Sequence, residues 1–210
     1  MFFRNNRIYK IDKNGNKKRI FFVLGLKITF KGKNSTITIK EPFPNFFRCK
    51  ISCGDNCNIS IGTSKFRMKK LRILADGKNS NITIGDNISI RNTCEIVARP
   101  ENNLSVKIGD DCMFASRILI RPTDGHIVKS VATGEVINYG EPIEIGNHVW
   151  IGNDVTILKG SKIPDNSVVA ATATVTRTFT EPNAIYAGVP AKLVKTGIDW
   201  SREVPGESLV

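Results

Sequence analysis

Between residues 143 and 175 an aliphatic side chain returns every six positions without interruption. The six positions are Ile145, Ile151, Ile157, Ile163, Val169 and Val175. A helix repeats every ~3.6 residues and a strand every two, so a strict period of six fits a chain that makes one short strand and one corner per repeat. Three such sides close a coil, and residues eighteen positions apart then lie above one another. The repeat predicts an all-β protein, a parallel β-helix with an aliphatic core.

Small residues and corner residues occupy fixed places in this repeat. Gly, Pro, Asn and Asp follow the inward positions in "IGNH", "IGND" and "IPDN", and these residue types tolerate the dihedral angles of tight corners. Four residues after each inward position stand Val149, Val155, Ser161, Ser167 and Ala173.

Cysteines take the same small place earlier in the chain. Cys57 stands four residues after Cys53, Cys94 four after Ile90, and Cys112 four after Ile108. Cysteine is a small hydrophobic residue when it is reduced, and no cysteine spacing in the chain matches a zinc site. We therefore expect reduced cysteines in the core.

A motif of the form I-x-I-G, with the variants V-x-I-G and I-x-I-K, extends the pattern toward the N-terminus. It ends at Ile39, Ile61, Ile84, Ile108 and Ile145, with intervals of 22, 23, 24 and 37 residues. The excess of the last interval falls in residues 121–142, which predicts a loop that leaves the solenoid. Loops on a rigid scaffold often carry binding and catalytic residues.

We expect three parts along the chain. Residues 1–30 form a basic segment of strands or a hairpin that caps the β-helix. Residues 31–180 form the β-helix with the loop 121–142, and residues 181–210 form a C-terminal extension. The 210 residues are 40% hydrophobic, which is enough for one core, and no apolar run approaches the ~18 residues of a membrane span. The N-terminus lacks the pattern of a signal peptide, so we expect a cytoplasmic protein.

Positive charge is concentrated in the first third of the chain. Residues 1–72 hold 18 Lys and Arg against 3 Asp and Glu, a balance of +15, whereas residues 73–210 hold 13 against 16, a balance of −3. This pattern indicates either an anionic partner or a solvated basic segment. Nucleic acid is disfavoured as that partner, because the aromatic residues of this region come as apolar pairs rather than as spaced stacking platforms.

The stretch "IEIGNHVWIGNDVTILKGSKIPDNSVVAATATVTR", followed by "AIYAGVPAKLV", resembles the hexapeptide-repeat acyltransferases. Within them it is most similar to the galactoside, streptogramin and capsular polysaccharide O-acetyltransferases, over residues 77–195. The resemblance implies a left-handed β-helix, acetyl-CoA as acyl donor and no metal. It also implies a homotrimer with sites between subunits and, as acceptor, a sugar hydroxyl of a capsular or lipopolysaccharide glycan.

The same resemblance implies that His126 in the loop is the catalytic base. A sugar hydroxyl is a poor nucleophile at neutral pH, and an imidazole with a pKa near 6.5 suits the removal of its proton. Asp124 or Glu135 could orient the ring, and the sequence does not decide between them. His148 stands at a corner place equivalent to those of Asp154 and Asn166, so we interpret it as a solvated corner residue whose replacement changes turnover little.

The resemblance also assigns residues to the donor. It places Trp150 beside the thioester arm with Asn153 at the following corner, Ala171 against the pantetheine, Thr176 and Arg177 near the adenosine phosphates, and Lys192 at the nucleotide end. The chain departs from the family pattern at Ala170, where glycine is preferred. Ala171 and Thr176 would also suit any β-helix corner.

Other functions remain open at this stage. An N-acetyltransferase that acts on a nucleotide-linked amino sugar would use the same scaffold, base and donor. A β-helix can also serve as a non-catalytic binding module, because a fold does not fix a function. A β-helix carbonic anhydrase would need three zinc-binding histidines, and the chain has two.

Overall fold

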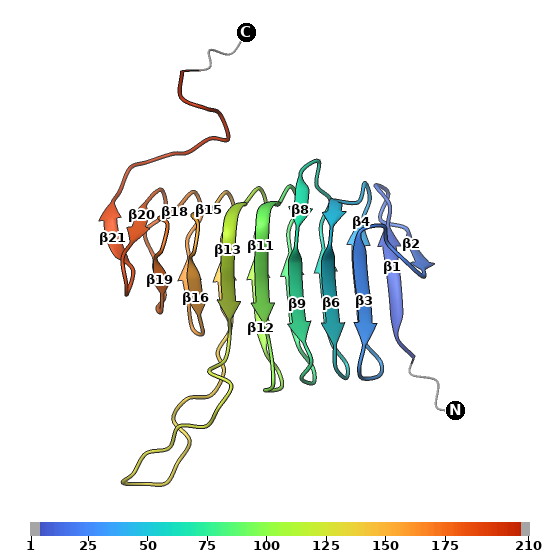
Figure 1. Cartoon of the computed structure of the whole chain (residues 1–210), viewed down its shortest axis with the longest axis horizontal. Coiled ribbons are helices and arrows are strands. Elements are labelled where there is room, and N and C mark those ends of the chain that lie inside the picture. Colours follow the sequence, from blue (N-terminus) through green and yellow to red (C-terminus); the bar gives the residue numbers. More distant parts are fainter. Residues whose placement is uncertain (1–4, 207–210) are drawn as a thin grey trace.

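The computed structural model describes residues 5–206, which coil into a triangular prism with three strand-built faces. Figure 1 shows the coils stacked side by side from the N-terminal to the C-terminal end. The first face contains β1 (Arg7–Ile11), β4 (Thr36–Lys40), β7 (Asn58–Ile61), β10 (Asn81–Ile84), β12 (Ser105–Ile108), β14 (Ile143–Ile145) and β17 (Lys162–Ile163). No helix within residues 5–206 has the length and apolarity to cross a membrane.

The second and third faces share two long strands, β11 (Ser89–Val97) and β13 (Met113–Arg121). The second face contains their first halves with β5 (Asn45–Phe47), β8 (Arg67–Lys69), β15 (Trp150–Ile151), β18 (Val168–Val169) and β20 (Ile185–Ala187). The third face contains their second halves with β3 (Leu26–Phe30), β6 (Cys49–Cys53), β9 (Leu71–Ala75), β16 (Thr156–Leu158) and β19 (Thr174–Val175). Each long strand turns the edge at one residue in left-handed conformation, Thr93 or Arg117, with φ of 59° in both.

The core is the aliphatic column that the six-residue repeat predicts. The six repeat positions from Ile145 to Val175 are at most 2% exposed, and the small positions four residues later are equally buried. All five cysteines are free and buried, which confirms the interpretation as core residues. Burial raises the pKa of the Cys53 and Cys112 thiols to about 12, so these thiols stay protonated and unreactive at neutral pH.

Asparagine side chains connect the coils along the edge between the third and first faces. Asn34, Asn56, Asn79 and Asn103 all have positive φ, which asparagine tolerates better than most residues. Their side-chain amides donate from each coil to the next at 3.3, 3.2 and 2.9 Å. The corner residues therefore also hold the coils in register.

Parallel pairing begins closer to the N-terminus than the expected boundary at residue 30. β1 pairs in parallel with β4 and β3 pairs in parallel with β6, so both already belong to the prism. These segments alternate in polarity but lack the I-G corner signal on which the expected boundary rests. The expected hairpin is formed by β2 (Lys17–Ile20), which pairs with β1 in antiparallel fashion over the end of the first face.

The C-terminal end closes differently. β20 continues the second face, and β21 (Lys192–Lys195) turns back to pair with it in antiparallel fashion. Residues 196–206 then leave the last coil as an extended tail, drawn in dark red in Figure 1. Residues 1–4 of the expected N-terminal segment and 207–210 of the expected extension lie outside the described residues.

Replacing Gly109 with alanine should destabilise the coil stack. A Cβ at this position would lie 2.6 Å from Gly146 O and 2.6 Å from Asn147 Oδ1 of the next coil, and backbone must move to accommodate it. We expect a loss of about 1–3 kcal/mol in the free energy of unfolding, measured by thermal or urea denaturation. Lys107→Ala, at an exposed position two residues earlier, is the control and should change this free energy by less than about 0.5 kcal/mol. Equal effects of the two substitutions would contradict the close stacking.

Candidate functional site

The segment between Arg121 and Ile143 leaves the prism as a long arm, seen below β13 in Figure 1. Its two sides pair with each other beyond the base of the arm. Ile137 N donates to Val128 O at 3.0 Å, Lys129 and Val136 form an antiparallel bridge, and Ser130 N donates to Glu135 O at 2.9 Å. The arm is therefore a hairpin with its own backbone hydrogen bonds.

Two charged side chains fix the base of this arm to the coils. The Glu101 carboxylate accepts a hydrogen bond from Gly140 N at 2.8 Å. The Lys159 ammonium donates to Asp124 Oδ2 at 2.6 Å and to Asn138 O at 3.0 Å. The hydrogen bond from Lys159 holds the pKa of Asp124 below its usual range. Sequence reasoning did not find Glu101 or Lys159, because neither lies in the loop that they anchor.

His126 lies in the arm beside a cavity of about 460 Å³. Pro100, Glu101, Asn138 and Tyr139 share the lining of this cavity with the histidine. The side chain is exposed, and its ring has no hydrogen-bond partner within residues 5–206. A free imidazole beside a hollow is available to a ligand that enters it.

Neither carboxylate considered for orienting His126 contacts its ring. Asp124 Oδ2 accepts hydrogen bonds from Lys159 and from Asn138 Nδ2. Glu135 Oε2 accepts one from the Thr133 hydroxyl at 3.3 Å. Both carboxylates therefore serve the structure of the arm.

Three of the residues assigned to the donor lie on consecutive coils near the edge between the second and third faces. Trp150 begins β15 and is 38% exposed, and Asn153 occupies the corner that follows. Thr172 N donates to Asn153 O at 2.8 Å, which places Ala171 at the matching corner of the next coil. The corners stack so closely that a Cβ on Gly152 would lie 2.6 Å from Ala171 N. The structure thus brings Trp150, Asn153 and Ala171 together.

The other three residues assigned to the donor are exposed at the C-terminal end of the prism. Thr176 and Arg177 follow β19 on the third face. Lys192 begins β21 and pairs with Ala187 of β20, at the end of the second face. Within one chain these residues do not form a single cluster with Trp150.

His126 and Trp150 lie at opposite ends of β13. Trp150 pairs with Met113 at the start of this strand, whereas the arm that carries His126 begins after Arg121 at its end. Between the two ends the strand turns the edge at Arg117. One chain alone therefore does not place the His126 imidazole beside Trp150.

His148 is a corner residue, but the prediction that its side chain is merely solvated is wrong. Its φ of 50° matches the corner conformation of Asp154 and Asn166. The ring, however, stacks on Trp200 at a centroid distance of 4.3 Å. Its Nδ1 lies 2.7 Å from Asp111 Oδ2, and its Nε2 lies 2.9 Å from Trp200 O. These contacts come from Asp111 and Trp200, which stand 37 and 52 positions away, so no local sequence pattern predicts them.

Both partners of the His148 ring are hydrogen-bond acceptors, so the protonated ring, in which both nitrogens donate, satisfies both contacts at once. Burial lowers the pKa of His148, but the hydrogen bonds to Asp111 and Trp200 O outweigh this and leave it above its ordinary value. Trp200 in turn donates from its indole Nε1 to His148 O at 2.8 Å. Residues 198–202, which we call the C-terminal strap, are thereby fixed to the prism.

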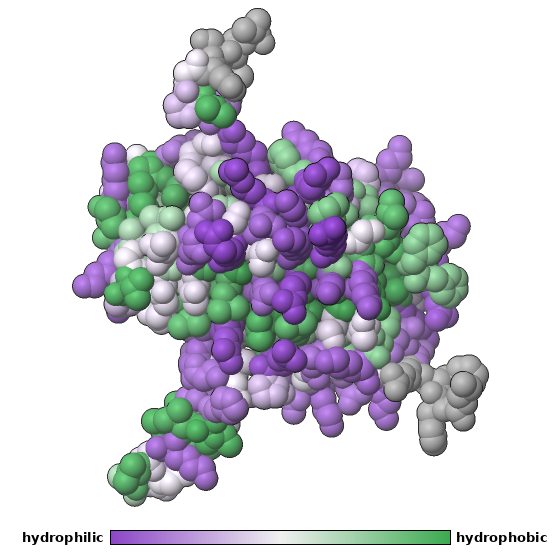
Figure 2. All heavy atoms as spheres, in the orientation of Figure 1, coloured by the Kyte–Doolittle hydropathy of each residue, from purple (hydrophilic) through white to green (hydrophobic). Residues whose placement is uncertain are grey.

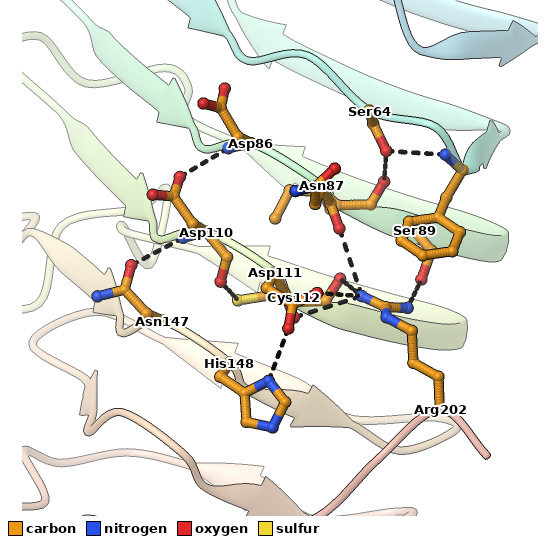
Figure 3. Close-up of polar contacts among 12 residues, drawn as sticks. Ser64, Asp86, Asn87, Ser89, Asp110, Asp111, Cys112, Asn147, His148 and Arg202 are labelled. Atoms are coloured by element: carbon orange, nitrogen blue, oxygen red, sulfur yellow. Dashed lines mark hydrogen bonds and ion pairs between the residues drawn. The ribbon is translucent and has the colours of Figure 1, made fainter.

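Arg202 provides the second anchor of the C-terminal strap. Figure 3 shows its guanidinium pointing between the corners of two coils. It donates to Ser89 Oγ at 2.6 Å, to Asp111 Oδ1 at 3.2 Å and to Cys112 O at 3.1 Å. The strap also places Trp200 with its ring centroid 6.1 Å from that of Trp150. The second tryptophan of the chain thus lies beside the exposed residue assigned to the donor.

Replacing His148 with alanine should loosen the C-terminal strap in a pH-dependent way. The folded pKa is raised, so the stabilisation is fully present below pH ~6.5 and is lost as the pH rises through the folded value. We expect His148→Ala to lower the free energy of unfolding by about 1–2 kcal/mol at pH ~5.5, with a smaller deficit at pH ~9. Thermal denaturation across this range measures it.

Asn166→Ala is the matched control, because it creates the same left-handed alanine without removing an ion pair. Its cost should not depend on pH. Trypsin should also cleave after Arg202 faster in His148→Ala than in the control. A His148→Ala deficit that is the same at all pH values would contradict a cationic ring.

Comparison with known proteins agrees with this architecture. Residues 142–177 match the family model "Bacterial transferase hexapeptide (six repeats)". A polysialic acid O-acetyltransferase of Neisseria meningitidis is 37% identical over 162 residues, which are 72% of this chain and 74% of that protein. The crystal structure of the polysialic acid O-acetyltransferase OatWY aligns with a TM-score of 0.55 and 29% identity, over 98% of this chain and 92% of that one. The polySia-specific acetyltransferase NeuO aligns with a TM-score of 0.58 and 24% identity, over 97% and 92% of the two chains.

The coiled faces, the repeat and the ejected arm define a hexapeptide-repeat acyltransferase with the left-handed parallel β-helix of that class. Within the class, the chain belongs to the family of the polysialic acid O-acetyltransferases. It is accordingly an acetyl-CoA-dependent O-acetyltransferase, and the fold class and enzyme class expected from the sequence are confirmed.

Proposed function

We propose that this enzyme transfers the acetyl group of acetyl-CoA to a hydroxyl of polysialic acid or of a closely related capsular glycan containing sialic acid. The observation that carries the proposal is the 37% identity with a polysialic acid O-acetyltransferase over 72% of the chain. The balance of +15 within residues 1–72 supports it, because each sialic acid unit carries a carboxylate that a basic surface attracts.

In this proposal His126 is the general base. Its exposed, unpaired imidazole removes the proton of the sugar hydroxyl while the hydroxyl oxygen attacks the thioester carbonyl. The tetrahedral intermediate then collapses, the C–S bond breaks, and the imidazolium returns the proton to the departing thiolate of coenzyme A. Backbone N–H groups at a coil edge serve the oxyanion without a special side chain.

The donor lies along the edge that carries Trp150, Asn153 and Ala171. Trp150 offers an exposed ring to the thioester arm, and the small Ala171 leaves the corner open to the pantetheine. Thr176, Arg177 and Lys192 are exposed at the C-terminal end, where two cations suit the phosphates of the nucleotide.

The active form is a homotrimer with sites between subunits. His126 and Trp150 lie at opposite ends of β13, so an arm from one copy must meet the Trp150 edge of another to complete a site. The arm carries apolar side chains that are more than half exposed in the single chain, namely Ile127, Val131, Ile137 and Tyr139. Figure 2 shows hydrophobic side chains on the arm, away from the prism. Packing against a second copy would bury them.

Replacing His126 with alanine should lower kcat by ~10²- to 10⁴-fold, the range for loss of a general base. Affinity for acetyl-CoA, measured by calorimetry, should change by less than about twofold because His126 does not hold the donor. Lys129→Ala, another exposed residue of the arm, is the control and should retain activity. Full turnover of His126→Ala on polysialic acid would refute the assignment of the base.

Mixing two inactive variants tests the shared site. If His126 and Trp150 of one site come from different subunits, randomly mixed trimers of His126→Ala and Trp150→Ala contain about a quarter of their sites intact. Co-expression should then restore roughly that share of wild-type kcat, whereas each variant alone stays inactive. No restoration, with mixed trimers shown by native mass spectrometry, would place both residues of a site on one chain.

A further inference from the structure

The third face carries a column of cations on neighbouring strands. Lys27 of β3 pairs in register with Lys50 of β6, and Lys50 pairs with Arg72 of β9. Strands lie ~4.8 Å apart, and like charges directly opposite one another destabilise a sheet. Arg72 forms an ion pair with Glu95 at 2.5 Å, but Lys27 and Lys50 are exposed and have no ionic partner within residues 5–206. The two lysines therefore add electrostatic repulsion between neighbouring strands, and no ion pair of their own offsets it.

Two further cations stand at corners where the backbone disfavours them. Arg48 and Lys70 lie at the edge between the second and third faces, each with φ of 54°. At the next edge the same conformation is taken by Asn56 and Asn79, which tolerate it at lower cost. Both basic residues line the same hollow as Lys27, Lys50 and Arg72. Arg48 and Lys70 thus stand at corners where asparagine would adopt the same backbone conformation at lower cost.

These side chains line a groove of about 1020 Å³ in which Glu95 is the single carboxylate. The aromatic rings of Phe22 and Phe47 share the lining. A second hollow of about 330 Å³ continues across the third face and adds Lys31, Arg99 and one carboxylate, Asp76. Figure 2 shows hydrophilic side chains gathered over β6, β9 and β11 in this region. Seven cations and two carboxylates therefore line one continuous depression, which we call the cationic track.

The cationic track leads to the base of the arm. Arg99 at its end is followed by Pro100, which lines the His126 cavity. In register, the column of Lys27 and its neighbours continues through Glu95 to Leu119, two residues before the end of β13. Four strand steps of ~4.8 Å make this path about 19 Å long, which is more than a single sugar ring occupies.

We infer that the cationic track binds the glycan chain of the acceptor through successive carboxylates, and so presents one sugar of that chain to His126. The inference rests on the proposed function, since the anionic glycan is the acceptor named there. Carboxylates match the ammonium groups of Lys27 and Lys50, which form no ion pair within residues 5–206, whereas Arg72 pairs with Glu95 and both Lys31 and Arg99 pair with Asp76. The apolar faces of sugar rings match Phe22 and Phe47. Selection for this binding accounts for a charge column that the fold itself does not need.

The test is a Lys27→Gln/Lys50→Gln double variant of the full chain. The KM for long polysialic acid should rise at least about tenfold in ~0.1 M salt, while kcat and the KM values for acetyl-CoA and for a sialic acid dimer stay within about twofold. The difference should close in ~1 M salt, where the Debye length falls from ~10 Å to ~3 Å. The thermal midpoint should stay equal or rise, because the substitutions remove repulsion between neighbouring strands.

Lys78→Gln/Lys107→Gln is the matched control, since it removes the same charge from exposed positions outside the cationic track. Equal KM changes in the two double variants would overturn the inference in favour of general charge attraction. Unchanged KM in both would overturn it in favour of a solvated surface.

A binding measurement without acetyl-CoA separates this inference from the proposed function. Fluorescence anisotropy of labelled polysialic acid should show binding to the wild type and to the control, and at least about tenfold weaker binding to Lys27→Gln/Lys50→Gln. If the double variant binds polysialic acid more weakly but the wild-type enzyme acetylates no sialic acid acceptor, the proposed function is refuted and the cationic track is supported. Acetyl transfer with equal binding by all three proteins would support the function and refute the track. Equally tight binding of single-stranded DNA would refute a glycan-specific track.

Discussion

Parallel backbone hydrogen bonding between successive coils is the constraint on which the rest of this structure depends. Each coil finds its partners only in the coils before and after it, so one register applies along every face. The inward aliphatic column sets that register, and the close contact of glycine corners such as Gly109 with the next coil leaves no room for a slip. A slip of one residue in the register would move every outward side chain to a different place.

The same stacking makes the outer surface of the prism a set of straight columns. A residue type repeated at one place in the coil becomes a line of side chains ~4.8 Å apart. Because of this alignment, the asparagines of one edge hydrogen-bond to one another. The same alignment brings the positive charges of Lys27, Lys50 and Arg72 close together. The surface of a solenoid can therefore offer a bound, extended polymer a row of charges at a matching spacing. A compact fold of this size does not offer such a row.

The functional parts lie where the coil is interrupted or ends. The arm leaves at the end of β13, where Glu101 and Lys159 hold its base, and it carries His126 away from its own Trp150. The C-terminal strap returns along the prism and lies against His148 and Asp111. Both segments depart from the six-residue repeat, so their positions depend on particular side chains and not on the stacking rule.

The sequence by itself determined the β-helix, its aliphatic and cysteine core, and the interruption that carries His126, because each of these follows from a strict local period or from its failure. It did not show that β1 and β3 already belong to the prism, since their corners lack the repeat signal. Only the tertiary structure decided that the His148 ring is held between Asp111 and Trp200, and that His126 and Trp150 lie at opposite ends of one strand. These relations join residues far apart in the chain, and a periodic sequence carries no information about which distant side chains meet.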